Sequence, residues 1–293
     1  MYNSQFELGH VALNVRNLEL QSLFYQQVLG LQILTENSKQ IDLGVGQTAL
    51  VRLIQTEQKG EVSHSYGLYH LAIVLPSRED LGTIFRHFID NKVPLQGASD
   101  HGYSEAIYLA DTEGNGIEIY RDLPQDTWDV RPDGRIVGIT EPMDAETIYA
   151  LGKKADAAYQ MPLGSRMGHI HLSVRESAAS SRFYQEVLAM GDKFSVPSAS
   201  WLASGDYHHH LAVNEWGGKN LETRQEGMPG LAYYTVIYSN QEAFEATLNR
   251  AIAVNLNLQR LDNSAAFVDV DGIKTGSIIS VVGKSTVEIM EPF

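Results

Sequence analysis

Strand-like and helix-like patterns of apolar residues follow one another along this chain. Residues 9–15 and 168–174 alternate in polarity and carry β-branched side chains, which is typical of strands. Each of these stretches is followed by apolar residues three and four positions apart, the spacing of one helix face. The same order returns later, with helices predicted from 78 to 91 and from 241 to 254. The pattern therefore predicts an α+β protein.

The chain also repeats itself. The stretch 9–15 reappears at 168–174, and Tyr25 with its two neighbours reappears around Tyr184, both at an offset of 159 residues. A second repeat relates 67–70 to 230–233 at an offset of 163 residues. Such repeats indicate four copies of one unit, and these begin near Leu8, Tyr69, Met167 and Ala232. Each unit is predicted to be a strand, a helix and further strands.

Residues 123–165 separate the second unit from the third and do not share the repeat. They contain Pro124, Pro132, Gly134 and Pro142. A helix is predicted from Asp144 to Gln160, because Pro142 and Asp144 suit a helix start. We interpret this segment as a connector between a first domain, 1–122, and a second domain, 166–293, with two units in each.

Charge and composition narrow the class of protein. The 22 Lys and Arg against 36 Asp and Glu give a net charge of −14, which argues against nucleic acid or an anionic membrane as partner. No apolar run approaches the roughly 18 residues of a membrane-spanning helix, and the first ten residues show no signal-peptide pattern. A cytoplasmic protein is therefore expected. The chain has no cysteine, so any metal ion must be held by His, Asp or Glu.

The four units resemble the βαβββ modules of the vicinal oxygen chelate superfamily, which includes glyoxalases, bleomycin-resistance proteins and extradiol dioxygenases. The resemblance covers nearly the whole chain apart from the connector. It implies that the modules pair into two open β-barrel domains, and that two modules can curl around one metal ion.

The resemblance also implies where metal ligands lie. They are a histidine in the first strand of one module, a histidine in the first strand of its partner, and a glutamate in that partner's last strand. The first-strand positions here hold His10, His70, His169 and Tyr233, and the last-strand glutamates are Glu118 and Glu288. Two histidines and one carboxylate leave coordination positions open, as non-heme Fe(II) oxygen chemistry requires. Pairing in chain order would give His10, His70 and Glu118, and a degenerate second set.

The segment 99–118 closely resembles the signature of extradiol ring-cleavage dioxygenases. The matching positions are His101, Ile107, Tyr108, Asp111, Gly114 and Glu118. Two positions depart from the pattern, since Thr112 replaces the usual proline and Ser99 the usual glycine. The turn from Asp111 to Gly114 does not strictly need a proline. The resemblance implies that His101 and Tyr108 lie in the active site.

Three consecutive histidines precede Leu211 in what is predicted to be a strand of the third module. Three adjacent imidazoles are hard to explain as structure, because they repel one another when protonated and cost desolvation when buried. Similarity to the family's His-His strand selects His209 as an active-site residue. A shift of one residue would select His210 instead. The first module has no histidine at the corresponding place.

The residues that match the family's active site are thus divided between the second and third modules. We therefore hypothesise that these two modules share one barrel, in which His169, His70 and Glu118 hold the metal, while modules one and four form the other barrel. If the modules pair in chain order, His10 replaces His169.

The resemblance implies an extradiol dioxygenase that opens a catechol ring with O₂ at a mononuclear Fe(II) site, with Mn(II) as the alternative metal. His209 would be the acid–base residue, and Tyr108 and His101 would hydrogen-bond the reacting oxygens. The expected partners are a small aromatic diol, O₂ and further copies of the chain in a homo-oligomer. Two alternatives remain open, a glyoxalase-like metal-dependent lyase or isomerase and a metal-free small-molecule-binding protein of the resistance type.

Overall fold

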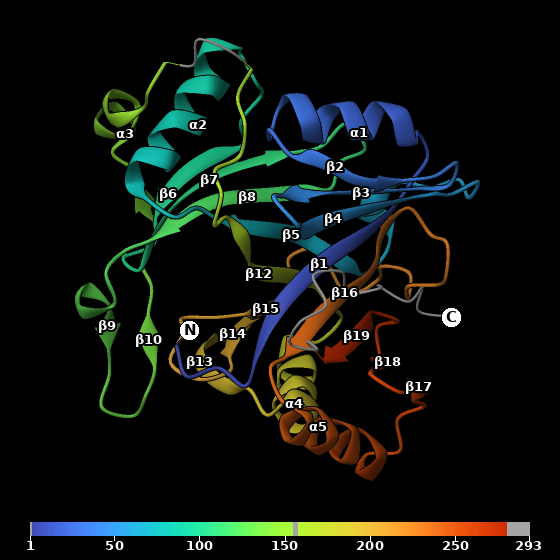
Figure 1. The fold of residues 1–293 in the computed structure, drawn as a ribbon. Coiled ribbons are helices and arrows are strands. Elements are labelled where there is room, and N and C mark those ends of the chain that lie inside the picture. Colours follow the sequence, from blue (N-terminus) through green and yellow to red (C-terminus); the bar gives the residue numbers. More distant parts are fainter. Residues whose placement is uncertain (1, 155–157, 280–293) are drawn as a thin grey trace.

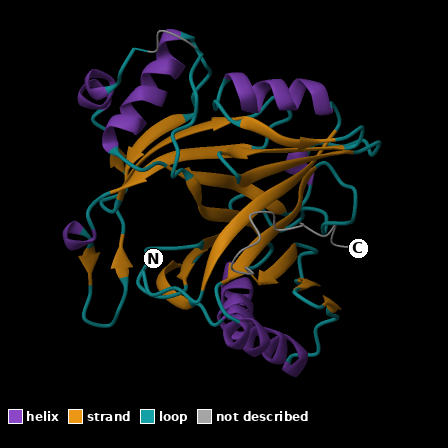
Figure 2. Cartoon of the chain, in the orientation of Figure 1, coloured by secondary structure: helices purple, strands orange, loops and turns teal. Residues whose placement is uncertain are grey.

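Two large mixed sheets form the centre of the protein, and helices lie on their outer sides. The structure, a computed structural model, describes residues 2–154 and 158–279. Figure 1 shows α1, α2 and α3 on one side of the strands and α4 and α5 on the other. Figure 2 shows the same division by secondary structure, with the strands in the middle. The α+β fold expected from the sequence is confirmed.

Each module contains a first strand, a helix and three further strands. The first module comprises β1 (Phe6–Val15), α1 (Leu18–Gln27), β2 (Gln32–Glu36), β3 (Gln40–Val45) and β4 (Thr48–Gln55). The second comprises β5 (Gly67–Val74), α2 (Arg78–Asp90), β6 (Gly97–Asp100), β7 (Ser104–Ala110) and β8 (Gly116–Asp122). The third comprises β12 (Arg166–Ser173), α4 (Ser177–Leu188), β13 (Gly191–Val196), β14 (Ala199–Ala203) and β15 (Leu211–Asn214). The fourth comprises β16 (Gly230–Tyr238), α5 (Gln241–Ala253), β17 (Gln259–Leu261), β18 (Ser264–Val268) and β19 (Lys274–Ile279).

The sheets pair the modules in crossed order. One sheet runs β17-β18-β19-β16-β1-β4-β3-β2 and joins modules one and four, while the other runs β11-β6-β7-β8-β5-β12-β15-β14-β13 and joins modules two and three. The first strands meet antiparallel at each junction, β1 with β16 and β5 with β12. The crossed pairing predicted from the histidines is therefore present. The segments 1–122 and 166–293 do not form separate sheets, because each contributes one module to both.

The connector is less helical than the sequence predicts. It contains a short 3₁₀ turn η2 (Gln125–Thr127), the strands β9 (Asp129–Val130), β10 (Ile136–Val137) and β11 (Glu141–Pro142), and the helix α3 (Ala145–Leu151). The Asp144 carboxylate caps α3 as expected, accepting from the backbone N–H of Thr147 at 3.1 Å. The helix ends at Gly152 rather than at Gln160, since Gly152 has extended backbone angles and weak helix propensity. A Cβ at Gly152 would lie 2.2 Å from the carbonyl oxygen of Gly82 in α2, so this close approach requires glycine.

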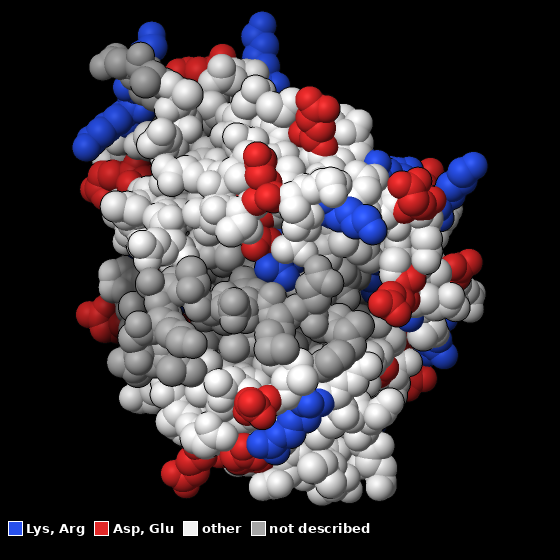
Figure 3. All heavy atoms as spheres, turned by 45° about the vertical axis from the view of Figure 1, so that its right-hand side comes forward, with Lys and Arg blue, Asp and Glu red and all other residues white. Residues whose placement is uncertain are grey.

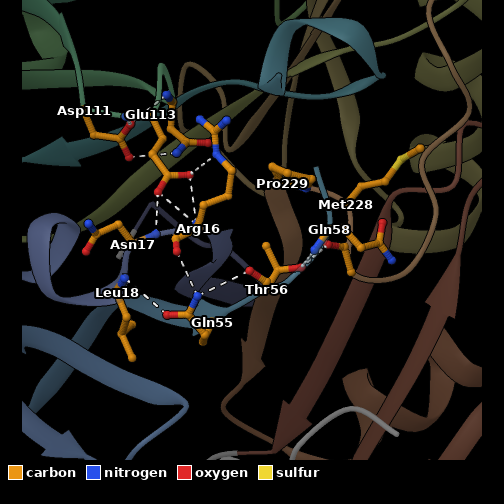
Figure 4. Close-up of polar contacts among 12 residues, drawn as sticks. Arg16, Asn17, Leu18, Gln55, Thr56, Gln58, Asp111, Glu113, Met228 and Pro229 are labelled. Carbon is orange, nitrogen blue, oxygen red and sulfur yellow. Dashed lines mark hydrogen bonds and ion pairs between the residues drawn. The ribbon is translucent and has the colours of Figure 1, made fainter. Parts of the chain in front are cut away.

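Modules one and two do not share a sheet and are joined by polar contacts between side chains and backbone. The Glu113 carboxylate, in the turn before β8, accepts hydrogen bonds from the backbone N–H groups of Arg16 and Asn17 at 2.9 Å (Figure 4). It thereby holds the amino-terminal end of α1, where a negative charge is favourable. Gln55 links to the same segment by donating to the carbonyl of Arg16 at 2.9 Å. Module two is thus fastened to module one by polar contacts and to module three by a sheet.

The repeated tyrosine has a structural reason. Tyr25 in α1 donates to Asp111 at 3.1 Å, and Tyr184 in α4 donates to Asp269 at 2.7 Å. Each aspartate lies in the turn before the last strand of the following module, so the same contact joins modules one and two and modules three and four. Both tyrosines are fully buried, and a buried hydroxyl must find a partner.

The surface carries both positive and negative side chains, as expected for a chain with an excess of Asp and Glu over Lys and Arg. On the face shown in Figure 3, the Lys and Arg side chains are scattered among Asp and Glu, and the described residues there form no continuous basic patch. None of the described helices is long and apolar enough to cross a membrane.

Candidate metal centre

Three side chains predicted as ligands meet on the inner face of the second sheet. The Glu118 Oε2 atom lies 3.0 Å from His70 Nε2 and 3.1 Å from His169 Nε2. The two imidazole nitrogens are 3.3 Å apart. Within the described part of the chain, this is the one group of three or more His or acidic side chains whose ligand atoms lie close enough to share a metal ion.

The geometry and charge of this triad fit a divalent metal ion. Ligand atoms on one edge of an octahedral site lie about 3 Å apart when each bond is about 2.1 Å long, and the three atoms have this spacing. Burial holds the pKa of His169 down at about 4, so its nitrogen is free to bind a metal at neutral pH. Burial would raise the pKa of Glu118, but the two histidines lower it well below its usual range. No described Lys or Arg pairs with this buried carboxylate, and a cation would compensate its charge.

Strand register places the three ligands. Ala72 in β5 lies between Glu118 in parallel β8 and His169 in antiparallel β12. His70 precedes Ala72 by two residues and therefore points to the same face. A bulge at Gly168, where a Cβ would clash with Tyr120, adjusts the register at His169.

The other sheet has the same register with different residues. Ala12 in β1 lies between Arg52 in β4 and Tyr233 in β16, and His10 precedes it by two residues. Arg52 thus stands where the ligand sheet has Glu118. Its guanidinium binds both oxygens of Asp42 at 2.7 and 2.9 Å and donates to the Tyr233 hydroxyl at 3.0 Å. A fixed cation there disfavours a metal ion.

This arrangement places His169 in the triad and the alternative candidate, His10, outside it. His10 belongs to the Arg52 site and not to the triad, and burial together with Arg52 lowers its pKa to about 3. Glu288, expected in the last strand of module four, lies outside the described residues. The strand that runs parallel to β16 is β19, with Gly276 beside Thr235.

The three consecutive histidines precede a strand instead of lying in one. The strand β15 begins at Leu211, and the chain bends before it. As a result the side chains do not alternate, and both His208 and His209 line the cavity beside the triad. The His209 ring lies 4.2 Å from that of His169, centroid to centroid. His210 points elsewhere, accepting from the Ser204 N–H at 3.3 Å.

Tyr108 and His101 form a hydrogen-bonded pair on the His70 side of the cavity. His101 Nε2 lies 2.5 Å from the Tyr108 hydroxyl, and its Nδ1 lies 2.9 Å from the carbonyl of Ile139. Because the carbonyl can only accept, Nδ1 carries the proton and Tyr108 donates to Nε2. Burial, and then the charge of Glu118, raise the pKa of Tyr108 far above its usual value. The hydroxyl therefore stays protonated.

Three residues of this region, His208, Asp122 and Tyr103, were not predicted as site residues. His208 Nδ1 lies 2.8 Å from His209 Nδ1, and its Nε2 lies 2.9 Å from Asp122 Oδ1. Tyr103 stacks on the His208 ring at 4.3 Å between centroids. A signal for Asp122 existed in the sequence, since it lies four residues after Glu118 in the same strand and so shares its face.

The cavity in front of the triad has a volume of about 860 Å³. Its walls away from the triad include four aromatic side chains among small polar and aliphatic residues, namely Tyr69, Phe194, Trp201 and Trp216. Its lining includes no Lys or Arg, and Glu118 is its one acidic residue. The site can therefore hold a flat, uncharged molecule against a metal ion.

Sequence comparisons relate the chain to one superfamily. The family model described as "Glyoxalase/Bleomycin resistance protein/Dioxygenase superfamily" matches residues 7–119. A curated protein from Bacillus subtilis (strain 168), named catechol-2,3-dioxygenase, is 33% identical over 263 residues, which cover 88% of this chain and 91% of that protein.

Solved structures share the fold at low sequence identity. A putative dioxygenase from Bacillus subtilis has a TM-score of 0.61 and 12% identity, over 95% of this chain and 86% of that one. A glyoxalase I mutant from Zea mays has a TM-score of 0.59 and 14% identity, over 94% of both chains. At these identities the likeness concerns the fold alone.

Proposed function

This chain belongs to the glyoxalase/bleomycin resistance protein/dioxygenase superfamily, and on that premise we propose that it is an extradiol dioxygenase that cleaves a catechol ring with O₂. One observation carries the proposal. The His70–Glu118–His169 triad shares a single cavity with His209 and with the Tyr108–His101 pair. The similarity to the Bacillus subtilis catechol-2,3-dioxygenase supports it.

The triad would hold Fe(II), or Mn(II) as the alternative. Such an ion would supply the charge that lowers the pKa of the diol hydroxyls, while the catechol ring itself is the reductant of O₂. Two neutral imidazoles and one carboxylate are the donor set expected for this chemistry.

Two groups that can handle protons flank the triad. His209 lies against His169, and burial keeps its pKa well below the usual value, so it is neutral and can accept a proton from a diol hydroxyl. Tyr108 lies on the other flank, with its ring centroid 5.8 Å from that of His70. Its hydroxyl proton is donated to His101 Nε2, so a lone pair of the Tyr108 oxygen can accept a hydrogen bond from a substrate hydroxyl. The site thus offers a hydrogen-bond acceptor on each of two different sides of the diol.

The cavity lining indicates which catechols fit. Its volume exceeds that of a single ring, and its aromatic walls suit a flat or apolar substituent. A carboxylated ring would bring a negative charge into a lining without Lys or Arg, at a desolvation cost. We therefore expect neutral catechols to be turned over with higher kcat/KM than carboxylated ones.

A glyoxalase-like isomerase is the principal alternative on this fold. It is less favoured because the triad contains a single carboxylate and because the Tyr108–His101 pair matches the ring-cleavage signature.

The test is O₂ uptake by protein purified without oxygen, loaded with Fe(II) and given catechol, together with the yellow ring-fission product. His70→Ala should abolish both signals. His10→Ala, the variant at the equivalent position of the other sheet, should keep them. Bound metal without O₂ uptake on any simple catechol would favour the isomerase, and protein that binds no metal would indicate a metal-free binding protein.

A further inference from the structure

A chain of hydrogen-bonded groups leads from the cavity wall to the outer end of β8. His209 contacts His208 through the two Nδ1 atoms at 2.8 Å, and His208 contacts Asp122 through Nε2 at 2.9 Å. The side chain of His208 is fully buried, and that of Asp122 is 11% exposed. This series of hydrogen bonds ends at the Asp122 carboxylate, which also accepts from the hydroxyls of Tyr207 and Tyr2, at 3.1 and 3.2 Å.

The order of donors in this chain follows from its carboxylate end. An ionised carboxylate can only accept hydrogen bonds, so the proton in the His208–Asp122 contact belongs to His208 Nε2. In a neutral His208 the other nitrogen, Nδ1, then carries a lone pair. That lone pair faces His209 Nδ1, which must be the donor.

This hydrogen bond also determines which nitrogen of His209 faces the cavity with a lone pair. With the proton on Nδ1, a neutral His209 has its lone pair on Nε2. Nδ1 is bonded to His208, while the described chain offers Nε2 no hydrogen-bond partner, and the residue lines the cavity next to His169. The free acceptor is therefore the nitrogen that remains available to a substrate.

We propose that Asp122 and His208 are positioning residues that fix the tautomer and ring orientation of His209, so that its Nε2 is ready to accept a proton from a bound hydroxyl. This role rests on the proposed dioxygenase function only for the identity of that hydroxyl. The O–H bond of the diol breaks, its electron pair stays on oxygen, and the proton forms the N–H bond at Nε2. His209 Nδ1 keeps its own proton and its bond to His208.

The inference also accounts for the three consecutive histidines. His209 meets the cavity, His208 connects it to Asp122, and His210 binds the Ser204 N–H on the other side of the chain. Adjacent residues of a strand could not both point into the cavity, whereas the bend before β15 permits it. Tyr103 stacked on His208 holds that ring in place.

Nitrogen NMR of histidine-labelled, zinc-loaded protein tests the tautomer directly, because Zn(II) is diamagnetic. The His209 signals are assigned by their loss in His209→Gln. The expected result is a proton on Nδ1 and none on Nε2. In His208→Leu, which removes the acceptor, this preference should disappear, whereas His208→Asn, whose amide oxygen can replace it, should keep it. Tyr2→Phe is the matched control, since it removes a different hydrogen bond to Asp122.

Kinetics with the Fe(II) protein give the second readout. A lost orientation of the acid–base residue should lower kcat of His208→Leu about tenfold to a hundredfold with little change in KM. His208→Asn should recover most of the loss.

Two results would overturn the proposal. One is a wild-type His209 protonated on Nε2, as a doubly protonated His208 would require. The other is a His208→Leu protein with an unchanged tautomer. Because the NMR result does not depend on turnover, protein with the expected tautomer but no ring cleavage would refute the dioxygenase function and support the tautomer assignment. If His208→Leu does not fold, the wild-type spectrum alone decides.

Discussion

Replacing Glu118 with glutamine should remove most of the stabilisation that a metal ion gives this protein. Glu118 is 2% exposed and is the single carboxylate of the triad. Glutamine keeps the size of the side chain but lacks its charge, so it is a far weaker ligand. The change separates metal binding from packing.

The expected magnitude follows from binding linkage. A metal ion at about 100 times its dissociation constant stabilises the folded protein by about 2.7 kcal/mol. For a chain of 293 residues that corresponds to a rise in Tm of about 4–5 °C. If Glu118→Gln weakens binding about a hundredfold, the same metal concentration gives only about 0.4 kcal/mol.

Thermal unfolding with and without Fe(II), Mn(II) or Zn(II) under nitrogen measures this increment, and metal analysis of the dialysed protein checks the stoichiometry. The matched control is Glu105→Gln. Glu105 is also a buried carboxylate, but it pairs with Arg78 at 2.6 Å and with Arg121 at 3.1 Å. Glu105→Gln should destabilise the protein by about 1–3 kcal/mol with or without metal. It should leave the stabilisation gained on adding metal unchanged. A full increment in Glu118→Gln, or none in the wild type, would refute the assignment of the triad.

Three further predictions concern polar contacts elsewhere in the fold. Glu113→Ala should lower the free energy of unfolding by about 1–2 kcal/mol in urea titrations, because the N–H groups of Arg16 and Asn17 just before α1 lose their anionic acceptor. The exposed Glu57→Ala should change it little. Arg52→Ala should cost about 3–5 kcal/mol by leaving Asp42 unpaired in the interior, and adding Asp42→Ala should restore much of it, whereas an unimproved double variant would argue against the pairing. Burial acts to raise the pKa of Glu105, but Arg78 and Arg121 lower it below its usual value. The ionised Glu105 therefore stabilises the fold fully above its unfolded pKa of about 4.5. This stabilisation is lost as the pH falls through the lower pKa of the folded state. Unfolding free energies measured from about pH 6 to pH 3 should therefore fall less steeply in Glu105→Gln than in the wild type.

Most of the fold could be predicted from the internal repeat of the sequence. The modules begin where the repeated stretches begin, and the helices expected at 78–91 and 241–254 are α2 (Arg78–Asp90) and α5 (Gln241–Ala253). These elements follow local periodicity and capping, which a sequence displays directly. The helix of the connector was overestimated, because its end at Gly152 depends on the approach of α2, a tertiary contact.

That His70, His169 and Glu118 lie together was predictable for a similar reason. His70, His169 and Glu118 occupy repeat positions, and their residue types limit the chemistry. The choice between His169 and His10 depended on which modules share a sheet, which the sequence offered only as a hypothesis. The structure adds that Arg52 takes the place of a glutamate in the other sheet, a correspondence visible only through the register of Ala12.

Local pattern and composition predict the four modules, exclude thiolate ligands and give the residue types of the candidate metal site. Tertiary contacts determine which modules pair, which of three adjacent histidines faces the triad, and that Asp122 stands behind His208. Those facts depend on strand register and on a bend before β15, where residues distant in the chain come into contact and strict alternation no longer holds.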